Sequence, residues 1–214
     1  MLEKLSYSQT KDVLEIISHR IIANQDALNK ADREIGDGDH GTAMVRGFTA
    51  VLKILELEEH ENLQALFIAA GNAMIASVGG CAGIIFGTFF RSGGKALDES
   101  MNLDATGFSK FLSGAYQAVK ARGKANLGDK TMLDALHPAV EEAKKSQHLD
   151  FPVFIHAVAE AAREGMINTG QLLASTGRAK DFGKNAIGKL DPGSITLYWI
   201  IDCFDAYLNK IHSI

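Results

Sequence analysis

Residues 32–42 have the sequence DREIGDGDHGT, which lies between two segments whose apolar residues recur at helical spacing. The stretch contains three aspartates, a histidine and three glycines. Glycine makes a loop pliable, so the carboxylates of Asp32, Asp37 and Asp39 can converge on one point. Hard oxygen ligands suit Mg²⁺ that is shared with phosphate oxygens, and one Mg²⁺ usually takes one or two protein carboxylates. Three carboxylates can therefore serve a pair of ions.

Spacing alone leaves two interpretations of this loop open. The aspartates either ligate metal or cap the flanking helices in a solvated turn. His40 is either a phosphate contact or an ordinary turn residue. A calcium loop of the EF-hand type fits poorly, because the twelfth position counted from Asp37 is Phe48 and not the closing glutamate.

Helical spacing of apolar residues continues along the rest of the chain. It predicts helices over residues 8–30, 42–55, 62–78, 84–91, 108–125, 126–147, 151–174 and 191–208. No segment shows sustained alternation of apolar and polar residues rich in β-branched types. We therefore expect an all-α protein, a bundle of eight helices.

Several residues predict where these helices begin. Ser6 and Gln9 have the form of a capping box, and Thr42 is placed to cap the second helix. Asp191 and the proline after it are typical of an N-cap followed by a first-turn proline. Pro138 falls inside the sixth helix, where it predicts a kink or a late start.

Composition bounds the class of protein. The chain of 214 residues is 46% hydrophobic and 22% charged, and no linker interrupts it, so we expect a single domain over residues 1–214. The net charge of −4 and the lack of Lys/Arg runs argue against a nucleic-acid partner. Only Cys81 and Cys203 are present, and the N-terminus has no apolar signal core, so a cytoplasmic location is expected.

The run from Ala65 to Phe90 has no charged residue and is longer than the ~20 residues that cross a bilayer. Asn72, Ser77 and Thr88 interrupt its apolar character. Gly79 and Gly80 lie mid-run, where two helices can meet in a turn. We therefore expect two buried helices and no membrane partner.

Three further clusters have both a structural and a functional interpretation. Glycines at 79, 83 and 87 either let helices pack closely or, with Gly80, form a turn whose backbone N–H groups bind phosphate. Residues 128–134, GDKTMLD, are an ordinary helix start or part of a site. Residues 176–178, TGR, place an arginine in the long loop 175–193, where it is either solvated or binds phosphate.

Taken together, the clusters resemble a known family in order and spacing: the L subunit of phosphotransferase-dependent dihydroxyacetone kinase and the nucleotide domain of ATP-dependent dihydroxyacetone kinases. The similar segments are DREIGDGDHG from Asp32, SVGG from Ser77 with GTFF from Gly87, GDKTMLD from Gly128, and TGRA from Thr176 with DPG from Asp191. The resemblance implies a barrel of eight antiparallel helices with a nucleotide site at one end.

The resemblance also implies the site residues. Asp32, Asp37 and Asp39 would hold two Mg²⁺ ions that bridge the phosphates of ADP or ATP. The implied nucleotide contacts are His40, Gly41, Thr42 and Ala43 with Gly80, Cys81, Ala82 and Gly83 around the phosphates, Met132 with Gly123 and Leu133 nearby on the adenine side, Thr131, and Gly177, Arg178, Asp191, Pro192 and Gly193 closing the site.

The implied reaction is phosphoryl transfer, in which a protein contributes positioning and charge neutralisation, so no nucleophilic side chain is required. Bound ADP would accept phosphate from a phosphohistidine carrier protein of the phosphotransferase system. The ATP formed would pass it to a hydroxyketone on a separate kinase subunit. The nucleotide half of an ATP-dependent ketose kinase and a nucleotide-sensing regulatory protein without turnover are the alternatives, and the sequence leaves a homodimer open.

Four positions depart from the family pattern. Ala82 replaces a serine and Ile84 a proline in the glycine turn, while Asn185 and Lys189 stand where an arginine and a histidine are expected. Loss of one neutral hydrogen bond costs ~1 kcal/mol, and loss of an arginine from a phosphate site costs more. The substitutions therefore leave open both the nucleotide affinity and the full activity that the resemblance implies.

Overall fold

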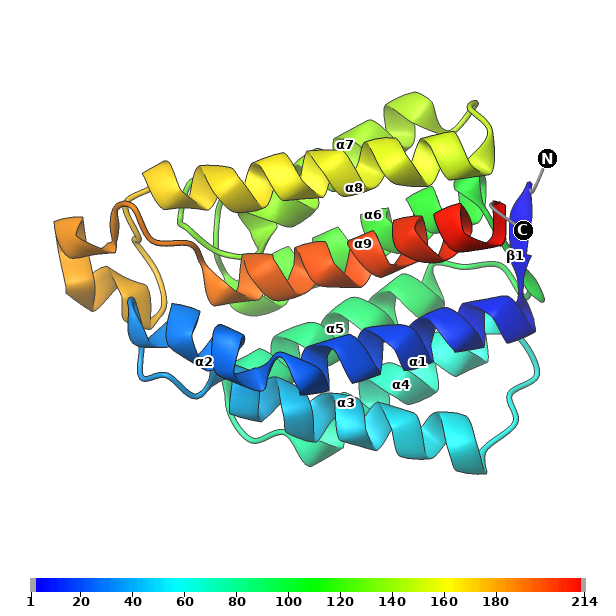
Figure 1. Ribbon diagram of the computed structural model, residues 1–214, viewed down its shortest axis with the longest axis horizontal. Coiled ribbons are helices and arrows are strands. Elements are labelled where there is room, and N and C mark those ends of the chain that lie inside the picture. The colour runs from blue at the N-terminus through cyan, green and yellow to red at the C-terminus, as the bar shows by residue number, and fades with distance from the viewer. Residues whose placement is uncertain (1–2, 213–214) are drawn as a thin grey trace.

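The computed structural model describes residues 3–212 and consists almost entirely of helices (Figure 1). In chain order the elements are β1 (Lys4–Ser6), α1 (Tyr7–Ala23), α2 (Gln25–Arg33), α3 (His40–Leu57), α4 (Leu63–Ser77), α5 (Cys81–Lys95), β2 (Asn102–Asp104), α6 (Ala105–Gly123), α7 (Leu133–Ser146), α8 (Phe151–Asn168), the 3-10 helices η1 (Thr169–Gln171) and η2 (Arg178–Ala186), and α9 (Pro192–His212). The predicted all-α class is confirmed.

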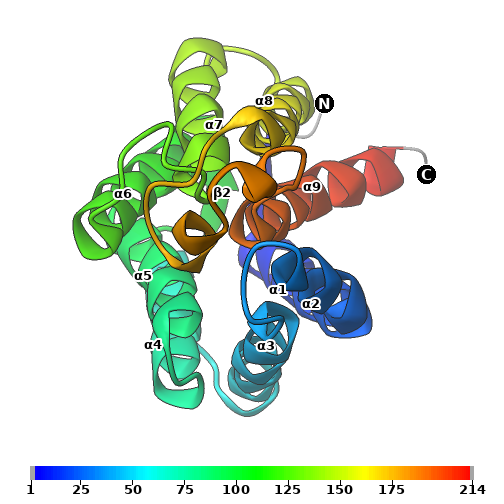
Figure 2. The same ribbon diagram turned by 90° about the vertical axis from the view of Figure 1, so that its left-hand side faces the viewer.

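Eight of the helices form a closed ring when viewed from one end (Figure 2). Neighbouring contacts run α1, α3, α4, α5, α6, α7, α8, α9 and back to α1. Each helix turns an apolar side inward, and aromatic rings fill the interior, such as Phe67 and Phe111 with ring centroids 4.6 Å apart. Burying these faces against one another stabilises the ring. The expected helical barrel is therefore present.

The first predicted helix, residues 8–30, is wrong in one respect, because the structure breaks it at Asn24. Helix α1 begins with the predicted capping box, in which Ser6 and Gln9 exchange hydrogen bonds. At Asn24 the backbone leaves helical geometry, and its side chain donates to the carbonyl of Arg20 at 2.7 Å. Helix α2 then packs on α3 and α9 at one end of the ring.

The uncharged run forms two helices, α4 and α5, that meet at Gly79 and Gly80, as expected. A Cβ at Gly71 would lie 2.5 Å from the Gly87 carbonyl, and one at Gly87 would lie 2.7 Å from the Gly71 carbonyl, so the two backbones cross in close contact. Of residues 3–212, none belongs to a helix long and apolar enough to cross a membrane.

Several element boundaries differ from the prediction. Helix α8 ends at Asn168 instead of continuing to 174, because the chain tightens into η1. Helix α7 begins at Leu133 instead of at 126, the late start that was one of the two predicted outcomes, and it contains Pro138. A two-stranded antiparallel sheet, β1 with β2, was not predicted and pairs Leu5 with Leu103. Both leucines are buried, so the sheet fixes the N-terminal segment beside the start of α6.

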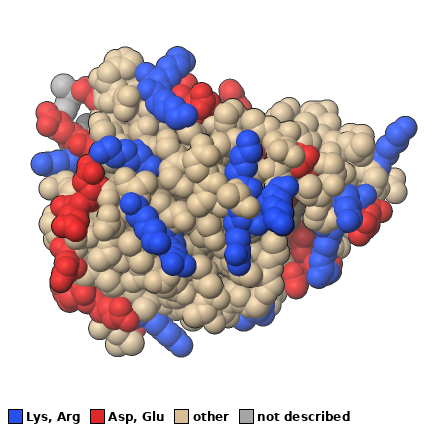
Figure 3. Space-filling view, turned by 180° about the vertical axis from the view of Figure 1, so that it is seen from behind, with Lys and Arg blue, Asp and Glu red and all other residues tan. Residues whose placement is uncertain are grey.

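Charged side chains are unevenly distributed over the surface. On the face formed by the helices at the back of Figure 1, Lys and Arg side chains are separated by uncharged surface, and acidic side chains gather along the edge at one end (Figure 3). Cations lying along a groove on α5 and α6 include Arg91, Lys95 and Arg122. The aspartate loop and the long loop before α9 lie at the other end of the ring, away from the β1–β2 sheet (Figure 1).

Candidate functional site

A cavity of about 300 Å³ opens at the end of the ring where the aspartate loop and the long loop meet. The segment that contains η2 lies across the centre of the ring at this end (Figure 2). The cavity is lined by Asp32, Ile35, Asp37, Asp39, His40, Ala43, Gly79, Gly80, Cys81, Ala82, Lys130, Thr131, Thr176, Gly177, Arg178, Ala179, Asp191 and Pro192. Segments from four parts of the sequence therefore meet at one place.

The three aspartates of the loop are brought together as predicted. Asp32, Asp37 and Asp39 each offer a carboxylate oxygen, and these oxygens lie within 4.8 Å of one another. Oxygens at this spacing can share one or two Mg²⁺ ions, which bind oxygen at 2.0–2.1 Å and keep several positions for water or phosphate. The donor set therefore fits a magnesium site that faces the cavity.

Two glycines allow the loop to take this shape. Gly38 has φ +80°, a conformation that other residues rarely adopt. A Cβ at Gly36 would lie 2.4 Å from Oδ1 of Asp32. The other oxygen of Asp32 accepts hydrogen bonds from the backbone N–H groups of Asp39 at 2.9 Å and His40 at 3.1 Å. Asp32 thus both faces the cavity and fixes the start of α3.

The prediction that Thr42 caps α3 is wrong. The N-cap position is Asp39, and Thr42 lies one turn in, where its N–H donates to the side-chain oxygen of Asn29 at 3.0 Å. Its hydroxyl accepts from the amides of Gln25 and Asn29. Gly41 lies against α2 as well, since a Cβ there would lie 2.2 Å from the Gln25 carbonyl. These two residues hold α2 against α3.

His40 lies in the cavity wall and is buried. Its Nε2 lies 2.8 Å from the hydroxyl of Thr196, which itself donates to the carbonyl of Pro192. Which of the His40 Nε2 and the Thr196 hydroxyl donates depends on the tautomer of the ring, and in either case the bond fixes the ring orientation. Burial lowers the pKa of His40 to about 4, against the opposing effect of Asp32. The ring is neutral at pH 7.

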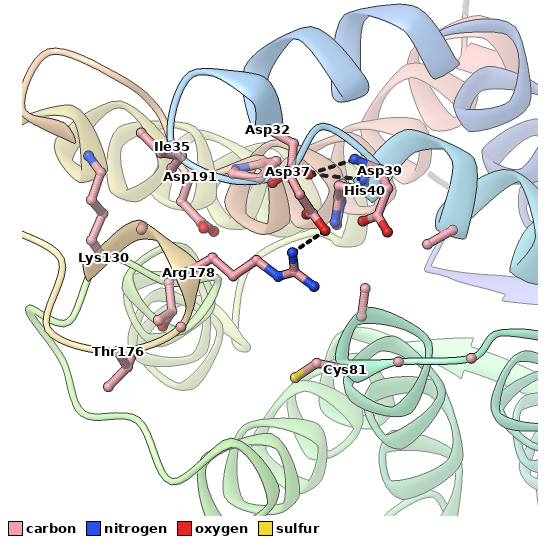
Figure 4. A pocket seen from close by; sticks show the side chains of 18 residues that line it. Asp32, Ile35, Asp37, Asp39, His40, Cys81, Lys130, Thr176, Arg178 and Asp191 are labelled. Atoms are coloured by element: carbon pink, nitrogen blue, oxygen red, sulfur yellow. Dashed lines mark hydrogen bonds and ion pairs between the residues drawn. The ribbon is translucent and has the colours of Figure 1, made fainter. Parts of the chain in front are cut away.

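The long loop reaches the aspartates through Arg178. Its guanidinium forms an ion pair with Asp37 across the cavity (Figure 4). Arg178 is mostly exposed, with 70% of its side chain accessible. An arginine in such a position offers a fork of N–H donors that matches phosphate oxygens as well as carboxylates.

The opposite wall is the start of α5. Gly80 is its N-cap with φ +90°, and Cys81 lies across the cavity from Asp37 in Figure 4. The first N–H groups of a helix have no intrahelical acceptor and carry partial positive charge, so they bind anions readily. Gly80, Cys81 and Ala82 line the cavity. Gly83 instead packs against Val78, since a Cβ added at Gly83 would lie 2.2 Å from the Cβ of Val78. The structure thus gives Gly83 a packing contact and brings Gly80, Cys81 and Ala82 to the cavity wall.

Asp191 adds a fourth carboxylate to the cavity. One oxygen accepts from the Ser194 N–H at 2.7 Å, so Asp191 caps α9 as predicted. Burial raises the pKa of Asp191 to about 7, and the nearby carboxylates of Asp134 and Asp32 add to the rise. The group is consequently partly protonated at neutral pH in the absence of added cations.

The remaining predicted contacts lie outside the cavity wall. They are Gly41, Thr42, Gly83, Gly123, Met132 and Gly193. Met132 is buried and lies beside Gly193, next to the cavity, while Gly123 ends α6 near Ile85. Asn185 and Lys189 do not line the cavity either. The substitutions at 185 and 189 therefore leave its lining unchanged.

The cavity is also lined by five residues of the predicted clusters that were not among the implied nucleotide or metal contacts: Ile35, Gly79, Lys130, Thr176 and Ala179. Lys130 is the most unusual of them, because it is a lysine with 1% exposure. Its place within the polar run GDKT was visible in the sequence. The burial of Lys130 was not visible in the sequence, because a lysine in a polar loop is ordinarily solvated.

The closed helical ring and the carboxylate-lined cavity define an all-α barrel protein with an acidic cavity at one end. Residues 34–206 match the DAK2 domain family, and the chain belongs to this family. Asp37 and Asp39 lie within the matched region, and Asp32 lies just before it.

Individual relatives agree with this assignment. The chain is 36% identical over 181 residues to the "PEP-dependent dihydroxyacetone kinase 1, ADP-binding subunit DhaL" of Listeria innocua serovar 6a, covering 85% of this chain and 86% of the relative. It is 35% identical over 176 residues to the Escherichia coli K12 PEP-dependent dihydroxyacetone kinase ADP-binding subunit DhaL, covering 81% and 84%. The L-erythrulose kinase of Pectobacterium atrosepticum is 32% identical, but the chain covers only 33% of that protein.

Among solved structures, the native form of the C. freundii dihydroxyacetone kinase superposes with a TM-score of 0.73 at 24% identity. The match covers 92% of this chain and 34% of that kinase. The likeness shows that the fold is shared.

Proposed function

We propose that this protein is the Mg-ADP-binding subunit of a kinase for dihydroxyacetone or a related hydroxyketone. The observation that carries the proposal is the convergence of three aspartate oxygens within 4.8 Å, in a cavity that also contains the start of α5. Carboxylates next to helix N–H groups suit a polyphosphate held through metal ions. The names of the relatives as ADP-binding kinase subunits support the nucleotide.

Each part of the cavity has a distinct task in this proposal. Asp32, Asp37 and Asp39 would hold two Mg²⁺ ions, which would neutralise phosphate charge during transfer. The N–H groups at Cys81 and Ala82 would bind phosphate oxygens, and Arg178 would exchange Asp37 for phosphate. His40, neutral and fixed by Thr196, would present an uncharged ring to the same region. Met132, with Gly123 and Leu133 nearby, would lie on the adenine side, and the segment from Asp191 to Gly193 would close the site.

The proposed reaction is a relay between two partners. A phosphohistidine carrier protein would supply the phosphoryl group to bound ADP, and a separate subunit would hold the ketone. Relatives named as DhaL subunits match over 84–93% of their own length, which supports the subunit form over the fused kinases. We propose that residues 1–214 act as one domain and that the relay operates in the cytoplasm, consistent with free thiols at Cys81 and Cys203.

The test is to dialyse the purified protein extensively with Mg²⁺ or with EDTA, heat it, and identify any released nucleotide. The relay predicts that adenine nucleotide is retained with Mg²⁺ and lost with EDTA. Free exchange with the bath would favour an ATP-dependent kinase. Absence of adenine nucleotide binding in both buffers would refute the proposal. Supplying a phosphorylated carrier and a ketone-loaded partner then separates transfer from regulatory binding without turnover.

A further inference from the structure

Lys130 is buried in a way that lysines seldom are. Its side chain is fully buried at 1% exposure, and its backbone is left-handed with φ +62°. A residue with a Cβ is strained in this conformation, and burying an ammonium is costly unless its donors are satisfied. The fold keeps both features at one position, so the side chain must make compensating contacts.

Those contacts go to the two ends, or stems, of the loop formed by residues 170–188, which connects α8 with the segment before α9. The Lys130 ammonium donates to the backbone carbonyl of Thr169 and to that of Lys189. Thr169 begins η1, where the chain leaves α8, and Lys189 precedes Asp191 at the start of α9. In Figure 4 the Lys130 side chain extends away from Asp37 and Arg178. Lys130 therefore joins the two stems of the loop and does not reach the aspartates.

Other hydrogen bonds close the base of the loop at the same place. The Gly188 N–H donates to the Gly170 carbonyl at 2.7 Å, and the Asp191 N–H donates to the Thr169 hydroxyl at 3.1 Å. The carboxylates of Asp191 and Asp134 lie close enough to Lys130 to oppose the lowering of its pKa by burial. The ammonium is thus compensated by carbonyl dipoles and by nearby negative charge.

The segment held by this base supplies one side of the cavity. Residues 176–179, including Arg178, lie between the two stems and line the cavity. Gly177 and Gly183 both have positive φ, and a Cβ at either would meet no atom within 4 Å. Around Gly177 and Gly183 the loop therefore packs little, and its position there depends on the contacts on either side, which include the Ser175 N–H donating to the Asp129 carbonyl at 3.4 Å as well as the base of the loop.

We propose that Lys130 is a positioning residue, a charged clamp that fixes both stems of the 170–188 loop and so sets Arg178 and its neighbours over the cavity. A compact ammonium with three donors suits two convergent carbonyls, whereas the planar fork of arginine does not. The consequence for nucleotide binding rests on the proposed function. The consequence for loop order does not.

The experiment compares Lys130→Met, which keeps the aliphatic stem, with Lys184→Met, the same change at an exposed lysine within the loop. Chymotryptic cleavage after Phe182 reports loop opening and needs no lysine. Well below the melting temperature, Lys130→Met is expected to raise this cleavage rate roughly tenfold and to weaken Mg-ADP binding roughly tenfold. Lys184→Met is expected to change neither the cleavage rate nor the binding.

Two controls separate clamping from general damage. Val140→Ala, a buried change on α7 outside the cavity, shows how much cleavage follows from lost stability alone. Mn²⁺ binding without nucleotide, followed by paramagnetic resonance, reports the aspartate cluster, and Lys130→Met is expected not to weaken it. If Lys130→Met is cleaved no faster than Val140→Ala, or binds Mg-ADP as tightly as wild type, the clamp is refuted.

If Lys130→Met does not fold, Lys130→Arg keeps the charge and replaces the ammonium. The clamp then predicts cleavage faster than wild type, and a wild-type rate would overturn it. Failure of the wild-type protein to bind nucleotide would refute the proposed function instead. The cleavage rates would still decide the role of Lys130.

Discussion

Ala82 stands in the first turn of α5, where the cavity wall offers backbone N–H groups and no hydroxyl. A serine there would add one donor to a phosphate oxygen without changing the helix start. We predict that Ala82→Ser tightens Mg-ADP binding by up to about fivefold, corresponding to ~1 kcal/mol for a neutral hydrogen bond. Calorimetric titration measures this. Ala76→Ser, on the exposed side of α4, should have no effect, and equal affinities for all three proteins would contradict the proposed position of the phosphates.

Single residues also mark how far sequence alone could define the site. Asp32, Asp37 and Asp39 were predicted correctly to lie together, because a short loop with glycines leaves them little distance to separate. The pairing of Arg178 with Asp37 and the burial of Lys130 were not predicted. Both depend on contacts between segments far apart in the chain, which no local pattern encodes.

At the scale of helices, the α4–α5 crossing positions the start of α5 in the cavity wall. Gly87→Ala would place a Cβ 2.5 Å from Ile75 and 2.7 Å from the Gly71 carbonyl, and a backbone atom cannot yield as a side chain can. We predict a loss of about 1–3 kcal/mol in the free energy of unfolding, measured by urea denaturation. Gly107→Ala in α6, where the nearest atom is 3.4 Å away, is the matched control and should not destabilise the protein. Equal stability of the two variants would show that the crossing tolerates a side chain.

Helices were easier to predict than their ends. Apolar spacing identified the ring helices because each has one buried side. The same spacing did not reveal the break at Asn24, because α2, which follows it, is also helical and continues the pattern. The strands β1 and β2 have three residues each, too few to show alternation. Helix α8 ends at Asn168 within sequence that still has apolar residues, and at this point the Thr169 carbonyl accepts a hydrogen bond from Lys130, a contact that no local pattern predicts.

In the molecule as a whole, the contacts that close the ring and the residues that line the cavity lie in different places. Contact between α1 and α9 closes the ring, and the β1–β2 sheet secures the end away from the cavity. At the other end, α2, the start of α5 and the long loop converge around one cavity of about 300 Å³. A rigid barrel that presents its charged side chains on loops at one end suits the proposed function, in which a charged ligand is held in place and remains accessible to partner proteins.

The proposed function requires Asp32, Asp37 and Asp39 to hold Mg²⁺ for ADP. The most direct measurement is calorimetric titration of wild type, Asp37→Asn and Asp181→Asn with ADP, each with Mg²⁺ and with EDTA. Asp181 is an exposed aspartate in η2 outside the cavity lining, so its substitution changes the same charge without touching the site. We predict that wild type and Asp181→Asn bind ADP only with Mg²⁺ and that Asp37→Asn binds at least roughly tenfold more weakly. Binding by Asp37→Asn with wild-type affinity, or wild-type binding unaffected by EDTA, would contradict it.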